Sequence, residues 1–255
     1  MMALLTLDKL TKIVSGDGNG EKILLDHVDL SLAEGDFVTV LGNNGAGKST
    51  LFNLISGSLR PTSGRIILAG TDITQASEAA HARLLSRVFQ DPKLGTAPRM
   101  TVAENLSLAE LRGQKRALRR RSLKEKLPEY ERRCAQVGNG LERQLNTPAG
   151  ELSGGQRQAL SLLMATMVAP KLLLLDEHTA ALDPKSSAQL MQLTAQLIKE
   201  QHLTCLMITH RLDDALKYGD RLLLLQNGRL VKDLDSAAKK ALTRAELLSF
   251  FKATM

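Results

Sequence analysis

The sequence predicts one α/β domain, with strands near both ends of the chain and helices between them. Short apolar or alternating runs fill the first third of the sequence. Two uninterrupted apolar runs, KLLLLDE and TCLMITH, come later and are typical of strands buried on both faces. Leucines between residues 101 and 167 recur with helical spacing. The length of 255 residues suits a single large domain.

The first strands are predicted from LLTLDKL, LDHVDLSL and DFVTVLG, separated by the SGDGNG loop at residues 15–20 and by Glu34-Gly35. GRIILAG and LSRVFQ add two more strands, and residues 184–201 have a helical pattern between the two buried runs. RLLLLQ and RLVKD flank Asn227-Gly228, a dipeptide that favours a two-residue hairpin. This order predicts a core of residues 1–90 and 166–235, a helical insertion at 91–165 and an amphipathic helical tail at 236–255.

The composition is ordinary for a globular protein, with 43% hydrophobic and 24% charged residues, which excludes a disordered or fibrous chain. The longest charge-free stretches, residues 158–170 and 186–198, have 13 residues each, whereas a membrane-spanning helix needs about 20. The N-terminus has neither a basic segment nor a cleavage site, so we expect no export. Cys205, in an apolar run, is predicted to be a reduced core residue of a cytosolic protein.

The net charge of +7 is concentrated in residues 112–126, which hold eight basic residues and one acidic residue. Outside this basic segment, basic and acidic residues are equal at 26 each. A protein that binds nucleic acid would more often have aromatic residues among its basic groups, and this segment has none. We therefore expect no nucleic-acid partner.

The segment GNNGAGKS at residues 42–49 matches the phosphate-binding pattern G-x-x-x-x-G-K-[ST]. It follows a predicted strand and precedes a predicted helix, where backbone N–H groups and the helix N-terminus can bind phosphate. Lys48 is predicted to reach the terminal phosphates, and the Ser49 hydroxyl to ligate Mg²⁺. The expected nucleotide-binding residues are Gly42, Asn43, Asn44, Gly45, Ala46, Gly47, Lys48, Ser49 and Thr50.

Two acids, Asp176 and Glu177, end the predicted strand LLLL at its carboxyl edge, where ligands bind in open α/β sheets. Nucleotide hydrolysis needs a carboxylate near the metal and a group that orients the attacking water. We therefore expect Asp176 to belong to the Mg²⁺ shell and Glu177 to orient and deprotonate the water.

LSGGQ at residues 152–156 stands between these two motifs, and here the chain resembles the nucleotide-binding subunits of ABC (ATP-binding cassette) transporters. The resemblance covers about residues 3–235 and includes VFQDP, LSGGQ, LLLLDE, ALDP and Thr209-His210, in the family's order. It implies an ATPase with a P-loop NTPase core, an antiparallel β subdomain and a helical subdomain insertion. It also implies ATP and Mg²⁺ as cofactors.

The resemblance assigns roles to further residues. Ser153 and Gln156 have the spacing of a capping box, which predicts a helix that begins within LSGGQ. In the family this end of the helix faces the γ-phosphate held by the other subunit of a head-to-tail dimer. Gln90 resembles the residue that touches Mg²⁺ and water, and His210 resembles the switch histidine at the γ-phosphate; a structural role for His210 is the alternative. The other residues expected at the shared sites are Gly154, Gly155 and Asp183.

Two features differ from the common pattern of the family, and a third resembles one subgroup of it. Val14 aligns where an aromatic residue usually stacks on adenine, so Ile13 or Val14 offers only apolar contact. His178 follows Glu177 where most members have Pro; we expect a surface turn, with contact to metal or γ-phosphate as the alternative. The strings DEHTAALDP, VFQDP and GTAPRMT resemble the ATPases of bacterial importers of tryptophan-like amino acids, which work with substrate-binding proteins.

The resemblance thus implies a cytoplasmic ATPase, peripheral on the inner face of the cell membrane. Its expected partners are a second copy or a related ATPase subunit, membrane permease subunits and, indirectly, a substrate-binding protein. The alternative is a non-transport ABC ATPase that acts in cluster assembly, in cell division or on nucleic acid. The basic segment 112–126 has two interpretations, a solvated helical face or a surface for anionic lipid head groups.

Overall fold

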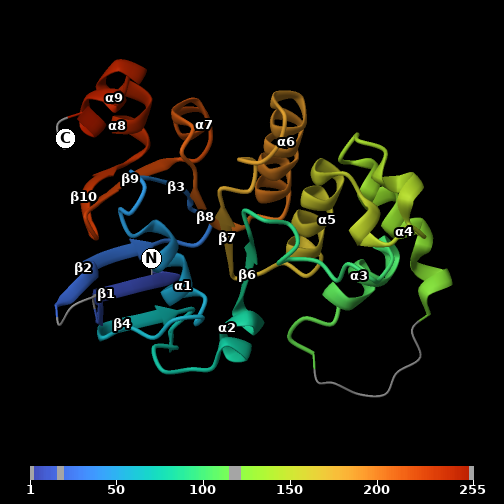
Figure 1. Cartoon of the computed structure of the whole chain (residues 1–255), viewed down its shortest axis with the longest axis horizontal. Coiled ribbons are helices and arrows are strands. Elements are labelled where there is room, and N and C mark those ends of the chain that lie inside the picture. The colour runs from blue at the N-terminus through green and yellow to red at the C-terminus, as the bar shows by residue number, and fades with distance from the viewer. Residues whose placement is uncertain (1–2, 16–19, 115–121, 253–255) are drawn as a thin grey trace.

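The computed structural model describes residues 3–15, 20–114 and 122–252, which form two sheets flanked by helices (Figure 1). The first sheet is antiparallel and four-stranded, in the order β2-β1-β4-β5. The second has the order β10-β9-β3-β8-β7-β6, with parallel pairing throughout except between β9 and β10. The strands are β1 (Leu5–Ser15), β2 (Glu21–Leu32), β3 (Phe37–Leu41), β4 (Ser63–Leu68), β5 (Thr71–Asp72), β6 (Leu85–Val88), β7 (Leu172–Asp176), β8 (Thr204–Ile208), β9 (Arg221–Gln226) and β10 (Arg229–Leu234).

The helices cover the second sheet and extend beyond it. In Figure 1, α3 and α4 lie at the opposite end of the molecule from the antiparallel sheet, with α5 and α6 between. The helices α3, α4 and α5 all come between β6 and β7 in the chain, as the helical spacing predicts; the boundaries of the insertion stay a prediction. The helices are α1 (Lys48–Ile55), α2 (Glu78–Leu84), α3 (Val102–Ala109), α4 (Leu123–Ala135), α5 (Gly154–Thr166), α6 (Pro184–Glu200), α7 (Leu212–Lys217), α8 (Ser236–Ala241) and α9 (Arg244–Lys252), with short 3₁₀ turns at Leu141–Gln144 and Ala149–Glu151.

The position of β7 between two hydrophobic cores explains why its sequence does not alternate between apolar and polar residues. Leu172 and Leu174 pack into the core shared with α1 and the antiparallel sheet, whereas Leu173 and Leu175 pack into the core shared with α5 and α6. Successive side chains of a strand point to opposite faces, so a strand covered on both sides needs apolar residues at every position. The residues of β3 and β8 are also all buried, and all of them except Thr39 and Thr204 are apolar. The predicted buried strands are confirmed.

The turn between β9 and β10, at Asn227-Gly228, joins the two sheets to the phosphate loop. The Gly228 N–H donates to Ala46 O at 3.0 Å, and the Gly228 carbonyl accepts from Asp26 N–H at 2.9 Å. Gly228 has φ +77°, and an added Cβ would lie 2.8 Å from the backbone oxygen of Leu24. Only glycine fits this approach, so the predicted hairpin turn also supports residues 42–47.

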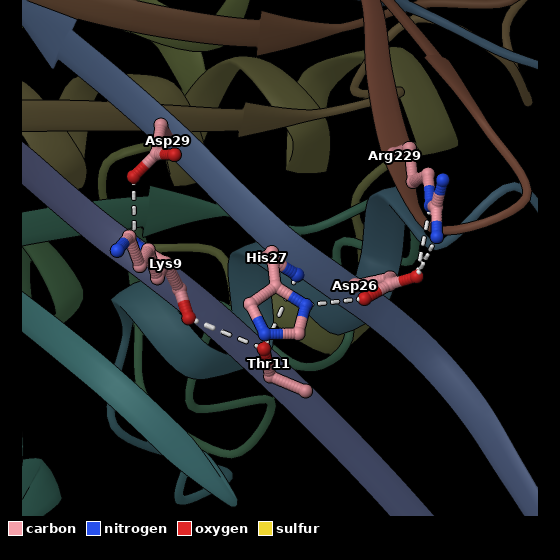
Figure 2. Close-up of polar contacts among 6 residues, drawn as sticks. All are labelled: Lys9, Thr11, Asp26, His27, Asp29 and Arg229. Carbon is pink, nitrogen blue, oxygen red and sulfur yellow. Dashed lines mark hydrogen bonds and ion pairs between the residues drawn. The ribbon is translucent and has the colours of Figure 1, made fainter.

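Polar contacts add to this junction (Figure 2). Asp26 accepts from Arg229 Nε at 2.8 Å, and its other oxygen lies 2.5 Å from His27 Nδ1. The His27 N–H donates to Thr11 Oγ1 at 3.1 Å, which ties β2 to β1. The contacts with His27 and Arg229 lower the pKa of Asp26. Because these groups are at the surface, each pair contributes little on its own, and the glycine turn determines the junction.

The C-terminal residues form α8 and α9, which pack on the end of the second sheet. Leu247 is fully buried beside Leu41 and Leu222. Lys239 is only 4% exposed; its ammonium donates to Gly219 O at 2.8 Å and to the Tyr218 carbonyl. Burial lowers the pKa of Lys239 to about 8.

Cys134 and Cys205 are buried free thiols, and burial raises the pKa of both, so Cys205 is the core residue that the sequence predicts. Within the described ranges, no helix is long and apolar enough to cross a bilayer. Five of the eight basic residues of the basic segment fall in residues 115–121, outside the described residues. At its ends, Arg112 donates to Ala165 O at 3.1 Å and Lys126 pairs with Glu110, so these two cations have protein partners.

Candidate functional site

The phosphate loop, residues 42–47, connects the buried strand β3 to α1. Gly42 packs so closely that an added Cβ would lie 2.4 Å from the backbone oxygen of Leu225. Gly47 is the N-cap residue of α1 with φ +102°, and an added Cβ would lie 2.7 Å from Leu24 O. Gly45 also has a positive φ, of +81°. The loop therefore needs glycine at these points, and its backbone forms a cradle at a helix N-terminus.

Lys48 closes the cradle from the first turn of α1. Its ammonium donates to Gly42 O at 2.7 Å and to Asn43 O at 3.1 Å. The residue is 7% exposed, and burial lowers its pKa, while the nearby carboxylates of Glu177 and Asp176 favour the charged form. The side chain is thus held over the loop, where its ammonium can bind the phosphates of a nucleotide.

The sheet order brings the other predicted residues to the same edge. Strands β3, β8, β7 and β6 are neighbours and parallel, so the residues after their carboxyl ends lie side by side. Asp176 ends β7, with Glu177 next; Gln90 follows β6 and is exposed; His210 follows β8 and is 52% exposed. Of the loop residues, Asn43, Asn44, Gly45 and Ser49 are exposed, Thr50 is half-buried and Ala46 is buried.

Arg87, which sequence reasoning missed, lies in the middle of β6 and binds Asp176. Its Nη2 donates to Asp176 Oδ2 at 2.6 Å, and its Nη1 donates to Asn53 Oδ1 at 2.7 Å. The guanidinium carbon lies 4.8 Å from the ring centre of Phe89 and 5.8 Å from that of Phe52. The side chains of Arg87 and Asp176 are only 10% and 13% exposed, respectively. A charged residue inside the apolar run LSRVFQ was the available signal.

Glu177 has a left-handed backbone, with φ +46°. Its N–H donates to Ile208 O at 3.0 Å, and its carbonyl accepts from Ala180 N–H at 2.9 Å. The carboxylate is 18% exposed, and Oε2 lies 3.3 Å from His210 Nδ1. The structure thus brings together the two residues predicted to act on the attacking water and the γ-phosphate.

His178 is not the surface turn residue that the sequence suggested. It is 2% exposed, and its Nε2 lies 3.0 Å from Thr194 Oγ1 in the middle of α6. Burial lowers its pKa to about 4, so the imidazole is neutral. The expectation of a surface turn is wrong because α6 packs over the loop after β7 and covers the ring.

The LSGGQ segment forms the predicted capping box at the start of α5. Ser153 Oγ accepts from Gln156 N–H at 3.3 Å, and Gln156 Oε1 accepts from Ser153 N–H at 3.2 Å. Asp183 is the N-cap of α6, where it accepts from Ser186 N–H at 3.0 Å, which lowers its pKa. An added Cβ on Gly155 would be 3.4 Å from Ser186 Oγ, so the starts of α5 and α6 lie side by side. Ser153, Gly154 and Asp183 are exposed there.

The donors at the site suit Mg²⁺ bound together with phosphate. No group of three or more His, Cys, Asp or Glu residues in the described part of the chain can hold a metal by itself. Ser49, Asp176 and Gln90 offer oxygen atoms, the ligands that Mg²⁺ prefers, and Mg²⁺ usually completes its shell with waters and substrate phosphates. Val14, predicted at the adenine, is half-buried near the end of β1, opposite Lys22 of β2.

A glycine-rich cradle before a helix, two acids at the carboxyl end of β7 in the same sheet and a capped LSGGQ helix define an ABC-type ATPase. Residues 25–180 match the ABC transporter family, and the chain belongs to that family. It is 43% identical to the tyrosine transport ATP-binding protein of Clostridioides difficile (strain R20291) over 97% of this chain and 98% of the relative. It is 35% identical to phosphonates import ATP-binding protein PhnC 1 of Ruegeria sp. (strain TM1040), over 94% and 92%.

Solved structures agree with the fold. A dimeric post-hydrolysis structure of the ATP-binding cassette MJ0796, bound to ADP and Pi, superimposes with a TM-score of 0.79 at 27% identity, over 91% of this chain and 98% of that one. The predicted fold class and the predicted family are confirmed. The protein is an ATP-binding subunit of an ABC transporter and an ATPase.

Proposed function

We propose that this ATPase drives the import of an amino acid or a similar small solute through a membrane permease. The Clostridioides difficile relative, which matches over nearly the whole length of both chains, is named for tyrosine transport. Aromatic amino acids are therefore the first cargo to test. The observation that carries the proposed mechanism is the shared edge of β3, β6, β7 and β8, where the phosphate loop, Asp176, Glu177 and His210 meet.

The phosphate loop binds the nucleotide through its N–H groups, the N-terminus of α1 and the Lys48 ammonium. To do so, Lys48 exchanges its bonds with the Gly42 and Asn43 carbonyls for phosphate oxygens. Ser49, Asp176 and Gln90 would hold Mg²⁺, which neutralises charge that develops on the phosphates. The apolar surface near Ile13 and Val14 takes the adenine.

Glu177 accepts the proton of the attacking water at its carboxylate, and His210 orients that carboxylate and the γ-phosphate. The 3.3 Å contact between the two side chains supports this pairing. Because the carboxylate is largely shielded from solvent, its charge acts at the reacting water with little screening.

A second subunit completes each site in the proposed mechanism. Ser153, Gly154, Gly155 and Gln156 of one copy face the γ-phosphate held by the other, and Asp183 links the two sites. The adjacent, exposed starts of α5 and α6 suit this contact, and the structural relative is a dimer. Purification from native membranes would show whether the partner is an identical or a related ATPase subunit.

We further propose that the helical segment 91–165, as a subdomain beside the core 1–90 and 166–235, docks on the permease at the cytoplasmic face of the membrane. Leu94 is 69% exposed, and Leu108 and Leu111 are also exposed, which supports an apolar partner there. A pull-down from native membranes tests this proposal. Recovery of a multi-span permease supports it, whereas recovery of a cluster-assembly, division or nucleic-acid protein favours a non-transport ATPase.

The catalytic assignment is tested with Glu177→Gln. The amide keeps the shape of the side chain but cannot accept a proton, so steady-state hydrolysis should fall at least a hundredfold while ATP binding persists. An ATP-bound dimer should then accumulate in size-exclusion chromatography. Glu200→Gln, the same change at an exposed site at the end of α6, is the control and should hydrolyse ATP like wild type. Near-normal turnover of Glu177→Gln would remove Glu177 from the mechanism.

A further inference from the structure

The backbone of Glu177 is unfavourable for a residue with a side chain. Its φ of +46° lies in the left-handed region, where the Cβ atom crowds the backbone. This conformation costs energy and persists only where surrounding contacts hold the residue in it. Two backbone hydrogen bonds fix its own peptide groups, to Ile208 and Ala180. The bond from Ala180 closes a turn over residues 177–180, and His178 lies inside this turn. The conformation of Glu177 therefore depends on how the turn is held against the rest of the protein, and the His178 side chain contacts α6.

His178 is attached to α6 by one directional bond. The ring is 2% exposed, and Thr194 is fully buried. The Thr194 hydroxyl donates its only hydrogen to Leu190 O at 2.7 Å, so its oxygen accepts from His178 Nε2–H at 3.0 Å. The other ring nitrogen, Nδ1, is buried without a hydrogen-bond partner in the described part of the chain. The Thr194 hydroxyl is therefore the one polar attachment that this ring has there.

We infer that the His178–Thr194 hydrogen bond is a positioning device that holds Glu177 in its left-handed conformation and aims its carboxylate at the attacking water. Thr194 belongs to a rigid helix, and His178 is covalently next to Glu177. The bond therefore fixes the loop after β7, which carries Glu177, relative to α6. The inference rests on the proposed role of Glu177 as the base. It makes His178 and Thr194 positioning residues, which act without touching the nucleotide.

The test removes the acceptor while the shape of the helix residue is kept. Thr194→Val should lower kcat at least tenfold, because small misplacements of a catalytic group are costly. KM for ATP and the affinity for a fluorescent ATP analogue with Mg²⁺ should stay within twofold, because the phosphate loop is untouched. Thr194→Ser restores the hydroxyl and should recover most of the lost kcat. His178→Gln, which can still donate from its amide, should retain more activity than His178→Leu.

Thr166→Val is the matched control. Thr166 is 2% exposed on α5, and its hydroxyl also donates to the carbonyl four residues earlier, at 2.9 Å. In the described part of the chain, it has no hydrogen bond to a histidine. The same chemical change there should leave kcat within twofold of wild type. Urea unfolding of each variant ensures that rates are compared for folded protein.

The outcomes separate this inference from the proposed function. Loss of turnover in Glu177→Gln together with normal kcat in Thr194→Val would overturn the positioning role alone. Normal turnover in Glu177→Gln would overturn the base assignment and the inference with it. An equal loss of kcat in Thr194→Val and Thr166→Val, or a rise in KM without a fall in kcat, would show a general structural effect and also overturn it.

Discussion

Replacing Arg87 with Met tests the ion pair that holds the metal-binding acid. The pair is short, at 2.6 Å, and its side chains are 10% and 13% exposed. Removing one partner of a buried pair leaves an uncompensated charge and costs about 3–5 kcal/mol; partial solvent contact puts this case near 3 kcal/mol. Met keeps an unbranched side chain near the Phe52 and Phe89 rings, so the change mainly removes charge and hydrogen bonds.

The assay is urea unfolding followed by circular dichroism, first without nucleotide. A double-mutant cycle with Asp176→Asn should give a coupling energy of about 2 kcal/mol or more. Arg87→Lys keeps the charge but not the planar fork and should lose only about 1 kcal/mol. With Mg²⁺ and a non-hydrolysable ATP analogue, the added cation compensates Asp176, so ligand should stabilise Arg87→Met more than wild type, by about 1 kcal/mol.

Two results would refute this reasoning. A coupling energy below about 0.5 kcal/mol would mean that the pair is energetically independent despite its geometry. A loss of stability in Arg87→Met that Mg²⁺ and nucleotide do not reduce at all would mean that Arg87 acts by packing and not as the counter-charge of Asp176.

Two further predictions follow from the same structure. Because burial lowers the pKa of Lys239 from 10.5 to about 8, the unfolded chain binds more protons between these pH values, and stability rises with pH across that window. Relative to Lys239→Met, the wild-type free energy of unfolding should increase by about 2 kcal/mol from pH 8 to 10.5 after allowance for solvent screening, and a flat difference would contradict the burial argument. Ser153→Arg removes the α5 cap and adds a cation at the exposed helix N-terminus, so the monomer should bind ATP normally but fail to dimerise. Size-exclusion chromatography in the Glu177→Gln background measures this, and ATP-dependent dimers of the double variant would exclude the proposed contact across the dimer.

The parts of the site that depend on a few consecutive residues could be predicted from the sequence. The glycine spacing of residues 42–49 determines a phosphate cradle because backbone freedom and N–H direction are local properties. The capping box of Ser153 and Gln156 is a contact between residues three apart, and the structure has it. The uninterrupted apolar run of β7 predicted burial on both faces, and the leucines alternate between two cores.

The contacts between distant residues were decided by the tertiary structure. Arg87 and Asp176 are 89 positions apart and pair only because the sheet order makes β6 and β7 neighbours. His178 looked like a surface residue because its local sequence is a turn, yet α6 packs over it and provides Thr194. Local backbone preferences and caps act within one turn of chain, whereas burial and ion pairing depend on which segments the fold brings together. The sequence therefore determined the chemistry of the site, and the packing of β6, β7 and α6 determined how two of its carboxylates are held.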